Sequence, residues 1–243
     1  MPELPEVEIC MRELSRRLRG KTILAIEVRD DRIKLSRTLV GQKILEISRR
    51  GKFIIFRLAD DRRILVHLGM TGWFEFTAPP GFRMAIITED GSAYFEDPRR
   101  FGKVHAVSAA QQQAILAKLG TEPLAPGFNL SALNKTKRPI KIALLDQRLI
   151  AGLGNIYTSE SLWRAGIDPR RRADQLREDE WRRLRGSISA VLRKAIAFGP
   201  RIYELQKFAV YDREDKPCRR CHTPIRRILL GGRSTYFCPR CQH

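Results

Sequence analysis

The sequence predicts an α+β fold: an N-terminal helix plus an antiparallel β-sandwich, followed by a helical region that ends in a β-hairpin. Three observations support this prediction. Apolar residues repeat at helical spacing near the N-terminus, short apolar segments separated by turn residues follow, and helical spacing returns beyond residue 129. The 243 residues suffice to bury a substantial core in more than one domain.

The first helix is expected between the proline-rich start and Gly20. Pro5 suits the first turn of a helix, and the acidic residues Glu6 and Glu8 complement the positive end of its dipole. Gly20 follows a basic last turn and is typical of a helix stop. Apolar residues at helical spacing would face the core: Leu4, Val7, Met11, Leu14 and Leu18.

The β-sandwich is expected from short segments with alternating or continuous apolar residues. Turn signals such as Arg50-Gly51, Asp60-Asp61 and Asp90-Gly91 lie between them. This spacing is typical of an antiparallel sandwich or barrel. The expected strands are residues 23–28, 43–48, 52–58, 63–68, 72–76, 84–88, 93–96 and 103–107.

The second half of the chain is expected to be helical. A short helix over 110–119 and a linker rich in Pro and Gly over 121–128 precede it. Helices are expected over 139–149 and 174–198, with a glycine-punctuated turn and a further helix between them. The expected domain boundaries are 1–120 for the sandwich, 121–207 for the helical domain and 208–243 for the hairpin.

The charge balance indicates a polyanionic partner. Lys and Arg total 46 against 27 Asp and Glu, for a net charge of +19. The basic residues are spread along the chain and not gathered in one cluster, which favours nucleic acid over a membrane surface. There is no long apolar run, and the acidic N-terminus does not resemble a signal peptide. We therefore expect a cytoplasmic protein with no membrane partner.

Four of the five cysteines lie near the C-terminus in the pattern C-x2-C-x16-C-x2-C. Two such knuckles separated by the length of a hairpin match the structural zinc pattern, and four thiolates complete a tetrahedral site. His222 and His243 are then bystanders, Cys10 is a small buried hydrophobe, and Gly231-Gly232 is the hairpin turn. The expected ligands of one structural Zn²⁺ are Cys218, Cys221, Cys238 and Cys241.

The first residues, MPELPEVE, allow two interpretations. If Met1 is removed, Pro2 becomes a terminal secondary amine with a pKa of about 8, so part of it is nucleophilic at neutral pH. Such an amine can attack a sugar C1′ or an aldehyde, and the resulting iminium stays cationic and favours elimination. Glu3 could donate or accept the proton. The alternative is that these residues only begin a helix.

Four separated motifs occur along the chain: MPELPEVE at the start, HLGMTG with DPRRFG in the β region, GLGNIYTSE in the helical region, and the four-cysteine hairpin. Together they resemble the bacterial formamidopyrimidine-DNA glycosylase family, whose relatives include endonuclease VIII. The resemblance covers nearly the whole chain, and Leu4 is similar to the formamidopyrimidine branch. It implies a helix-two-turns-helix domain over 121–207 and a bifunctional DNA glycosylase and AP lyase that removes oxidised or ring-opened bases.

The resemblance implies catalytic roles for four residues. Pro2 would attack C1′ of the damaged nucleotide, and Glu3 would protonate the sugar ring oxygen. Lys52 would assist elimination near the phosphate. Arg233, beside the tip of the cysteine hairpin, would hold phosphates and help the second elimination, since a hairpin tip lets a guanidinium reach a nucleic-acid backbone bidentately.

The resemblance also implies how the duplex is held. Met70, Arg99 and Phe101 would fill the gap left by a flipped base, although Met70 and Phe101 could also be core residues. The residues implied to hold DNA phosphates are Asn155, Lys137, Lys141 and His67. Alternatively, the two lysines lie on a solvated face, and the histidine is a core residue with its hydrogen bonds satisfied.

Two departures from the family pattern are expected to affect the substrate. The loop TAPPGFR is short and lacks a histidine that relatives often carry there. Only residues 200–217, without a glycine, separate the last helix from the cysteine hairpin, where relatives usually have a glycine-rich loop that folds over extruded 8-oxoguanine. We expect abasic sites and ring-opened or non-planar oxidised bases to be better substrates than 8-oxoguanine paired with cytosine.

Two alternatives stay open from the sequence. One is a non-catalytic or abasic-site-only damaged-DNA-binding protein of the same fold, and the other is an unrelated basic zinc-ribbon protein. The presence of Pro2, Glu3, Lys52 and Arg233 argues against pure binding. The expected partner is double-stranded DNA with damaged bases or abasic sites, bound by a monomer in the bacterial nucleoid.

Overall fold

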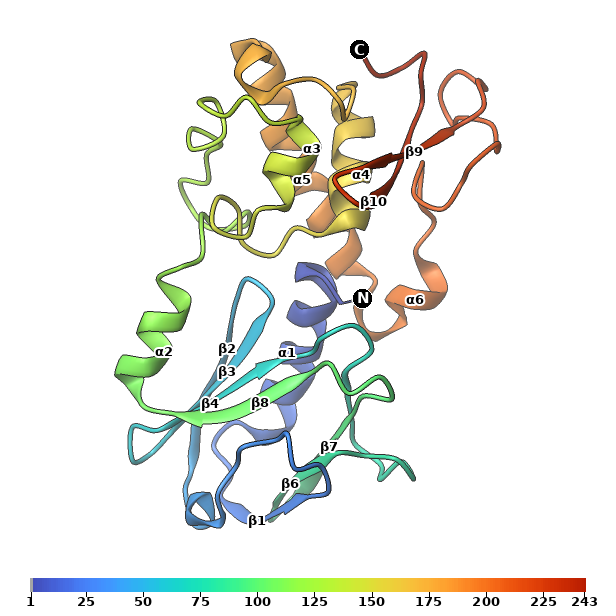
Figure 1. The fold of residues 1–243 in the computed structure, drawn as a ribbon. Helices are drawn as coiled ribbons and strands as arrows, with labels where there is room; N and C mark the ends of the chain where they lie inside the picture. The colour runs from blue at the N-terminus through green and yellow to red at the C-terminus, as the bar shows by residue number, and fades with distance from the viewer. Residues whose placement is uncertain (1) are drawn as a thin grey trace. The chain divides into compact units, whose positions relative to one another are not determined.

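The computed structural model describes residues 2–243 and separates into two compact units, with the boundary between Lys118 and Leu119 (Figure 1). The α+β class and its antiparallel sheets, predicted from the sequence, are confirmed. The division into 1–120, 121–207 and 208–243 stays a prediction. Met1, whose removal would free the Pro2 amine, lies outside the described residues.

The N-terminal unit contains two four-stranded antiparallel sheets. The strand order of the first is β1 (Ile23–Val28), β6 (Met84–Thr88), β7 (Gly91–Glu96) and β5 (Trp73–Glu75). The order of the second is β2 (Ile44–Arg50), β3 (Phe53–Leu58), β4 (Arg63–His67) and β8 (Lys103–Val107). The unit also includes a 3-10 helix, η1 (Arg37–Leu39), and α2 (Ala109–Leu116).

Helix α1 (Leu4–Leu18) contacts strands of both sheets, namely β2 and β3 on one side and β5 and β7 on the other. Its buried side chains, including Val7 and Leu14, join Phe56 and Phe95 in one apolar core. Full burial of such a side chain stabilises the fold by about 1.5–3 kcal/mol. The helix ends where predicted, since Gly20 adopts φ +82°. The core therefore holds the N-terminal end of the chain in place.

The C-terminal unit combines helices with a two-stranded hairpin. Helix α4 packs against α3, α5 and β10. Gly231 and Gly232 have φ values of +57° and +73°, which gives the hairpin the predicted tight turn. The elements are α3 (Ile140–Leu145), α4 (Asn155–Ala165), η2 (Ala173–Gln175), α5 (Glu178–Ala197), η3 (Gly199–Arg201), α6 (Ile202–Leu205), β9 (Arg226–Leu230) and β10 (Arg233–Phe237).

Two helices of this unit are shorter than predicted. Helix α3 ends at Leu145 because the Asp146 carboxylate accepts the Arg148 N–H at 3.1 Å and starts a turn. Helix α5 begins at Glu178, since a 3-10 turn occupies residues 173–175. Helix α6, of four residues, was not predicted.

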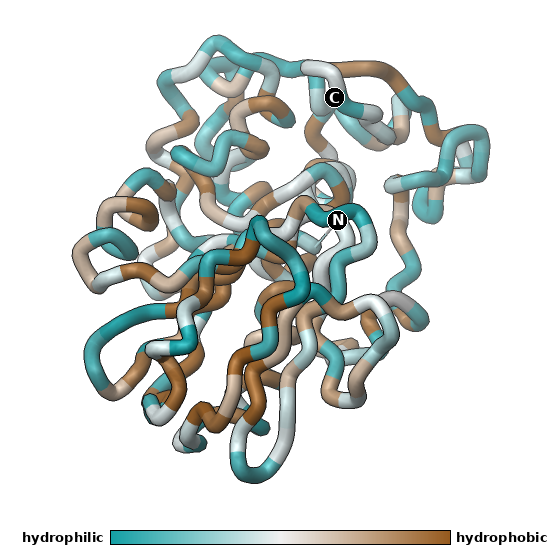
Figure 2. Tube along the Cα trace, turned by 60° about the horizontal axis from the view of Figure 1, so that its bottom comes forward, coloured by the Kyte–Doolittle hydropathy of each residue, from teal (hydrophilic) through white to brown (hydrophobic). Residues whose placement is uncertain are grey.

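Hydrophobic positions follow the strands and helices, whereas the tips of the turns are mostly hydrophilic (Figure 2). In the part of the chain that the structure describes, no helix combines the length and apolarity needed to cross a membrane.

Candidate active site and nucleic-acid interface

Pro2 and Glu3 are buried at the start of α1. Glu3 is the N-cap, and it exchanges hydrogen bonds with Glu6: the Glu3 N–H donates to Glu6 Oε2 at 2.9 Å, and the Glu3 carboxylate accepts from the Glu6 N–H. The positive end of the helix dipole favours a carboxylate at this position. The residues of MPELPEVE therefore begin a helix, and they also hold an acid next to Pro2. The nucleophilic role of Pro2 stays a prediction.

Lys52 lies in the turn between β2 and β3, and this turn is tied to α1. The Arg49 Nε donates to Glu8 Oε2 of α1 at 2.7 Å, and its Nη1 donates to the Gly51 carbonyl at 2.9 Å. Both side chains of the Arg49–Glu8 pair are largely buried, which makes the link more rigid than a surface ion pair. The ion pair thus links the turn that contains Lys52 to α1, the helix that follows Pro2 and Glu3.

His67 is partly buried at the end of β4. Its Nδ1 accepts the Gly69 N–H at 3.1 Å, and its ring packs edge-to-face against Phe53 at 5.1 Å. Burial, followed by the charges of Lys52 and Lys103, lowers the pKa of His67 to about 4. His67 is therefore a neutral imidazole at pH 7. Its expected phosphate contact stays a prediction.

Met70, Arg99 and Phe101 are exposed on two loops of the N-terminal unit. Met70 is 38% exposed and Phe101 51%, so neither is a core residue. The Arg99 guanidinium lies 5.1 Å from the centre of the Phe101 ring. Exposed apolar side chains beside a cation suit contact with stacked bases.

Lys141 and Asn155 lie where α3 and α4 meet β10, and both bond the hairpin. Lys141 is 0% exposed, and its ammonium donates to the Ser234 carbonyl at 3.0 Å and to Thr235 Oγ1 at 2.7 Å. The Asn155 Nδ2 donates to the same carbonyl at 3.0 Å. The expectation that Lys141 lies on a solvated or DNA-facing surface needs correction, because its charge is directed into the protein.

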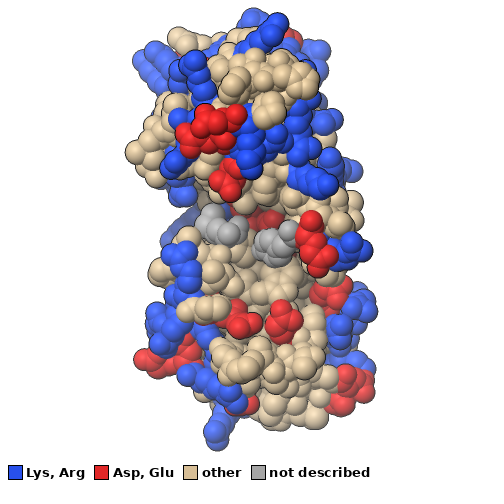
Figure 3. Space-filling model, turned by 90° about the vertical axis from the view of Figure 1, so that its right-hand side faces the viewer, with Lys and Arg blue, Asp and Glu red and all other residues tan. Residues whose placement is uncertain are grey.

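Lys137 and Arg233 are exposed cations of the C-terminal unit. Arg233 begins β10 directly after the glycine turn. The hydrogen-bonded Arg172 guanidinium, and to a smaller extent the charge of nearby Lys137, lower the pKa of the Asp174 carboxyl. On the visible face of this unit, Lys and Arg cover more surface than Asp and Glu (Figure 3). These positions are compatible with contacts to a polyanion.

The four terminal cysteines fit a tetrahedral zinc site. Their sulfur atoms all lie within 4.8 Å of one another, with 3.9 Å from Cys218 to Cys241 and 3.4 Å from Cys221 to Cys238. Zn–S bonds of about 2.3 Å in a tetrahedron require sulfur separations near 3.8 Å. The Trp163 indole N–H and the Arg220 backbone N–H each donate to Cys218 Sγ at 3.4 Å, which suits a thiolate.

Glu160 is a structural residue that the sequence did not reveal. It is buried on α4, and its carboxylate accepts backbone N–H groups of Ala209, Val210 and Tyr211 at 2.8–2.9 Å. The only available signal was a glutamate on the apolar face of a predicted helix. These bonds attach the segment between α6 and the cysteine hairpin to α4.

The acid at a helix start, the exposed cations and the zinc-binding hairpin define a nucleic-acid-processing enzyme with a structural metal. Three family models match the chain: the formamidopyrimidine-DNA glycosylase N-terminal domain at residues 1–104, its H2TH domain at 119–207, and a zinc finger found in FPG and IleRS at 215–243.

Individual relatives agree with these matches. The formamidopyrimidine-DNA glycosylase of Thermus thermophilus is 41% identical over 264 aligned residues, covering 100% of this chain and 98% of the relative. A crystal structure of the Thermus thermophilus protein has a TM-score of 0.89 at 39% identity, covering 99% and 98% of the two chains. The Lactococcus lactis enzyme bound to DNA with an AP site has a TM-score of 0.91 at 37% identity and covers 99% of both chains.

The chain belongs to the formamidopyrimidine-DNA glycosylase family. It is a DNA base-excision repair glycosylase with one structural zinc, and AP lyase activity is a general property of the family. The alignment of 264 residues is longer than the 243 residues of this chain, so the Thermus thermophilus relative has residues that this chain lacks.

Proposed function

We propose that the enzyme removes oxidised or ring-opened bases from double-stranded DNA with Pro2 as the nucleophile and then cleaves the strand by elimination. The observation that carries this proposal is the position of Glu3. Glu3 directly follows Pro2 in the chain and is 1% exposed. Its reciprocal hydrogen bonds with Glu6 orient its carboxylate. A fixed acid beside a nucleophile is what general acid catalysis requires.

The proposed reaction begins when the Pro2 nitrogen attacks C1′ and the base leaves with the electrons of the glycosidic bond, taking up the proton that the Pro2 amine loses. Glu3 protonates the sugar ring oxygen, the ring opens, and a cationic iminium joins Pro2 to C1′. Loss of a C2′ proton then expels the 3′ phosphate, and a second elimination expels the 5′ phosphate. Lys52 assists the first elimination and Arg233 the second.

The DNA is held by residues of both units in this proposal. Met70, Arg99 and Phe101 fill the gap left by the flipped base, and Lys137, Asn155 and His67 hold phosphates, His67 as a neutral donor. Lys141 acts indirectly, because its ammonium supports the hairpin that presents Arg233. We also propose that the enzyme is a monomer that works on nucleoid DNA. The net charge of +19 supports the DNA partner.

The proposed lesion preference rests on the short segment 200–217. Three backbone N–H groups in its second half are already bonded to Glu160, which leaves few residues to cover an extruded base. Without such a cover, hydrogen bonds that identify the base edge are lost, and selection depends on how easily a base unstacks. Single-turnover excision on matched duplexes should be slower for 8-oxoguanine than for ring-opened purines. An equal or faster rate for 8-oxoguanine refutes this preference.

Borohydride trapping tests the central proposal. Reduction of the iminium should leave a covalent adduct between the enzyme and DNA with an abasic site, located on Pro2 by peptide mass analysis. Intact mass should show that Met1 is absent from the active protein. An active enzyme that retains Met1 would contradict the mechanism, because its proline nitrogen is an amide.

A further inference from the structure

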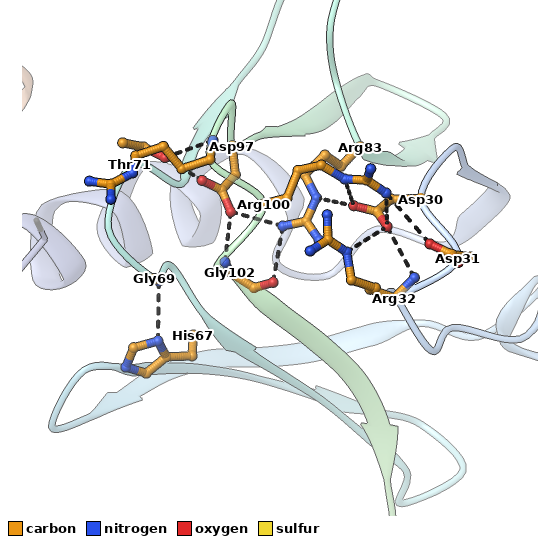
Figure 4. A network of polar contacts seen from close by, with 11 residues as sticks. Asp30, Asp31, Arg32, His67, Gly69, Thr71, Arg83, Asp97, Arg100 and Gly102 are labelled. Carbon is orange, nitrogen blue, oxygen red and sulfur yellow. Dashed lines mark hydrogen bonds and ion pairs between the residues drawn. The ribbon is translucent and has the colours of Figure 1, made fainter.

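The two loops that carry the exposed residues Met70, Arg99 and Phe101 touch each other through their backbones. Gly69, next to Met70, has φ +70°, and a Cβ on it would lie 2.5 Å from the Gly102 nitrogen and 2.7 Å from the Phe101 carbonyl carbon. No side chain fits in that space. The loop after β4 and the loop before β8 are therefore in direct contact (Figure 4).

Asp97 joins the same two loops through its carboxylate. Its Oδ2 accepts the Gly102 N–H at 2.6 Å, and its Oδ1 accepts a hydrogen bond from the Thr71 hydroxyl. The Thr71 Oγ1 in turn accepts the Arg99 N–H at 3.3 Å. Asp97 is 1% exposed, so its bond to the Gly102 N–H is shielded from water, whereas Thr71 connects this buried carboxylate to the exposed backbone of Arg99 (Figure 4).

A buried ion network anchors this junction to the sandwich. The Arg83 Nη1 donates to Asp97 Oδ2 at 2.9 Å and to the Gly102 carbonyl at 3.0 Å, and its Nε donates to Asp30 at 2.6 Å. Arg100 adds two hydrogen bonds to Asp30, at 2.6 and 2.9 Å, and holds the pKa of that carboxyl well below its usual range. Arg32 also contacts Asp30, with its Nε 3.4 Å from Oδ1, so three guanidinium groups surround the two carboxylates (Figure 4).

We infer that Thr71 and Asp97 are positioning residues that hold the Met70 loop and the Arg99–Phe101 loop as one rigid wedge for entry into the duplex. The inference rests on the proposed function, in which these exposed side chains fill the gap left by the flipped base. Two independent loops would lose conformational entropy on entering the base stack. Loops already joined lose less, so base extrusion is faster.

Thr71→Val tests the junction, because it removes the bridging hydroxyl, keeps the side-chain shape, and leaves the Arg83 network intact. Thr71→Ser restores the hydroxyl, and Thr77→Val is a matched change at an exposed threonine after β5. Base extrusion is followed by stopped-flow fluorescence of 2-aminopurine beside a ring-opened purine. We expect Thr71→Val to slow extrusion about tenfold, the effect of losing one hydrogen bond to a charged group, with the other two variants within about twofold of the wild type.

Two further measurements separate positioning from general damage. Borohydride trapping on a preformed abasic site should be unchanged in Thr71→Val, because that substrate has no base to extrude. In the wild type, the effects of Met70→Ala and Phe101→Ala on extrusion should be coupled, and the coupling should disappear in the Thr71→Val background.

The outcomes distinguish this inference from the proposed function. If Met70→Ala leaves extrusion unchanged, the wedge in the proposed function is wrong. If Met70→Ala slows extrusion while Thr71→Val matches the wild type, only the positioning role is overturned. Equal slowing by Thr71→Val and Thr71→Ser also overturns it, since the hydroxyl would then not be the cause.

Discussion

The two units hold their functional residues by different physical means. In the N-terminal unit, α1 and both sheets share one apolar core, and three candidate catalytic residues, Pro2, Glu3 and Lys52, lie next to elements of that core. In the C-terminal unit, the hairpin depends on four cysteines and on polar bonds from Lys141 and Asn155. A small apolar cluster that includes Val210 and Ile225 surrounds those cysteines.

This difference separates the chemistry at Pro2 from the binding of phosphates by the hairpin. Apolar burial depends little on metal or salt, whereas thiolate ligands, buried ammonium groups and phosphate contacts depend on metal, pH and ionic strength. Conditions that remove zinc should therefore disable DNA binding before they disturb the residues near Pro2. Mutation at the N-terminus should have the opposite effect: it should disable excision and leave DNA binding intact.

The largest expected effect comes from Pro2→Gly. It removes the secondary amine and should lower single-turnover excision on the order of 10³-fold or more. DNA affinity, measured by fluorescence anisotropy, should stay within about threefold because many phosphate contacts share it. Equal losses of affinity and turnover would contradict the separation of chemistry from binding.

Glu3→Gln should lower base excision by about 10²–10⁴-fold, the usual range for loss of a general acid. Cleavage of preformed abasic sites should continue in part, since no base has to leave. The Gln side chain keeps an oxygen that can accept the Glu6 N–H, so α1 should still form. Unchanged excision would remove Glu3 from the mechanism.

Zinc removal should act on the other unit. Chelation, or Cys238→Ser, should release the hairpin and with it Arg233, and lower DNA affinity about tenfold or more together with strand cleavage. Cys10→Ala is the control, because Cys10 lies in the core of the N-terminal unit. Full affinity and cleavage in metal-free protein would refute the dependence.

Two lysines offer a sharper comparison within the C-terminal unit. Lys141→Met leaves the buried Thr235 hydroxyl without this donor and should destabilise the hairpin by about 1–3 kcal/mol, measured as faster zinc release. Lys137→Met should leave zinc release unchanged. It should reduce the slope of log DNA affinity against log salt concentration by about one, the effect of losing one phosphate contact. Similar behaviour of the two variants would argue against the different roles.

The smallest expected effect concerns His67 and the stability of the N-terminal unit. Because the folded pKa of about 4 lies below the ordinary value of 6.5, only the unfolded chain takes up the proton between these values, and stability falls as the pH drops from 6.5 to 4. The loss is at most about 3 kcal/mol. In urea unfolding, His67→Gln should lack this part of the pH dependence, and an identical pH profile would show that His67 does not cause it.

The sequence by itself determined the features that depend on local patterns. Strands β1, β6 and β8 have the predicted bounds, because apolar alternation and turn residues act over a few neighbours. The four cysteines converge as predicted, since two knuckles and a glycine turn specify a hairpin of that length. The short helix α6 escaped prediction because four residues carry too little periodicity.

Only the tertiary structure decided how distant residues are paired. From the sequence, Lys141 was expected to be a surface cation, but its ammonium donates a hydrogen bond to Thr235, 94 positions away. The Glu160 carboxylate likewise accepts hydrogen bonds from backbone N–H groups 49 to 51 positions away. The Thr71–Asp97 bridge joins two loops whose spacing depends on both sheets. A buried polar side chain is stable only where packing brings a partner to it, and a linear sequence does not contain that distance.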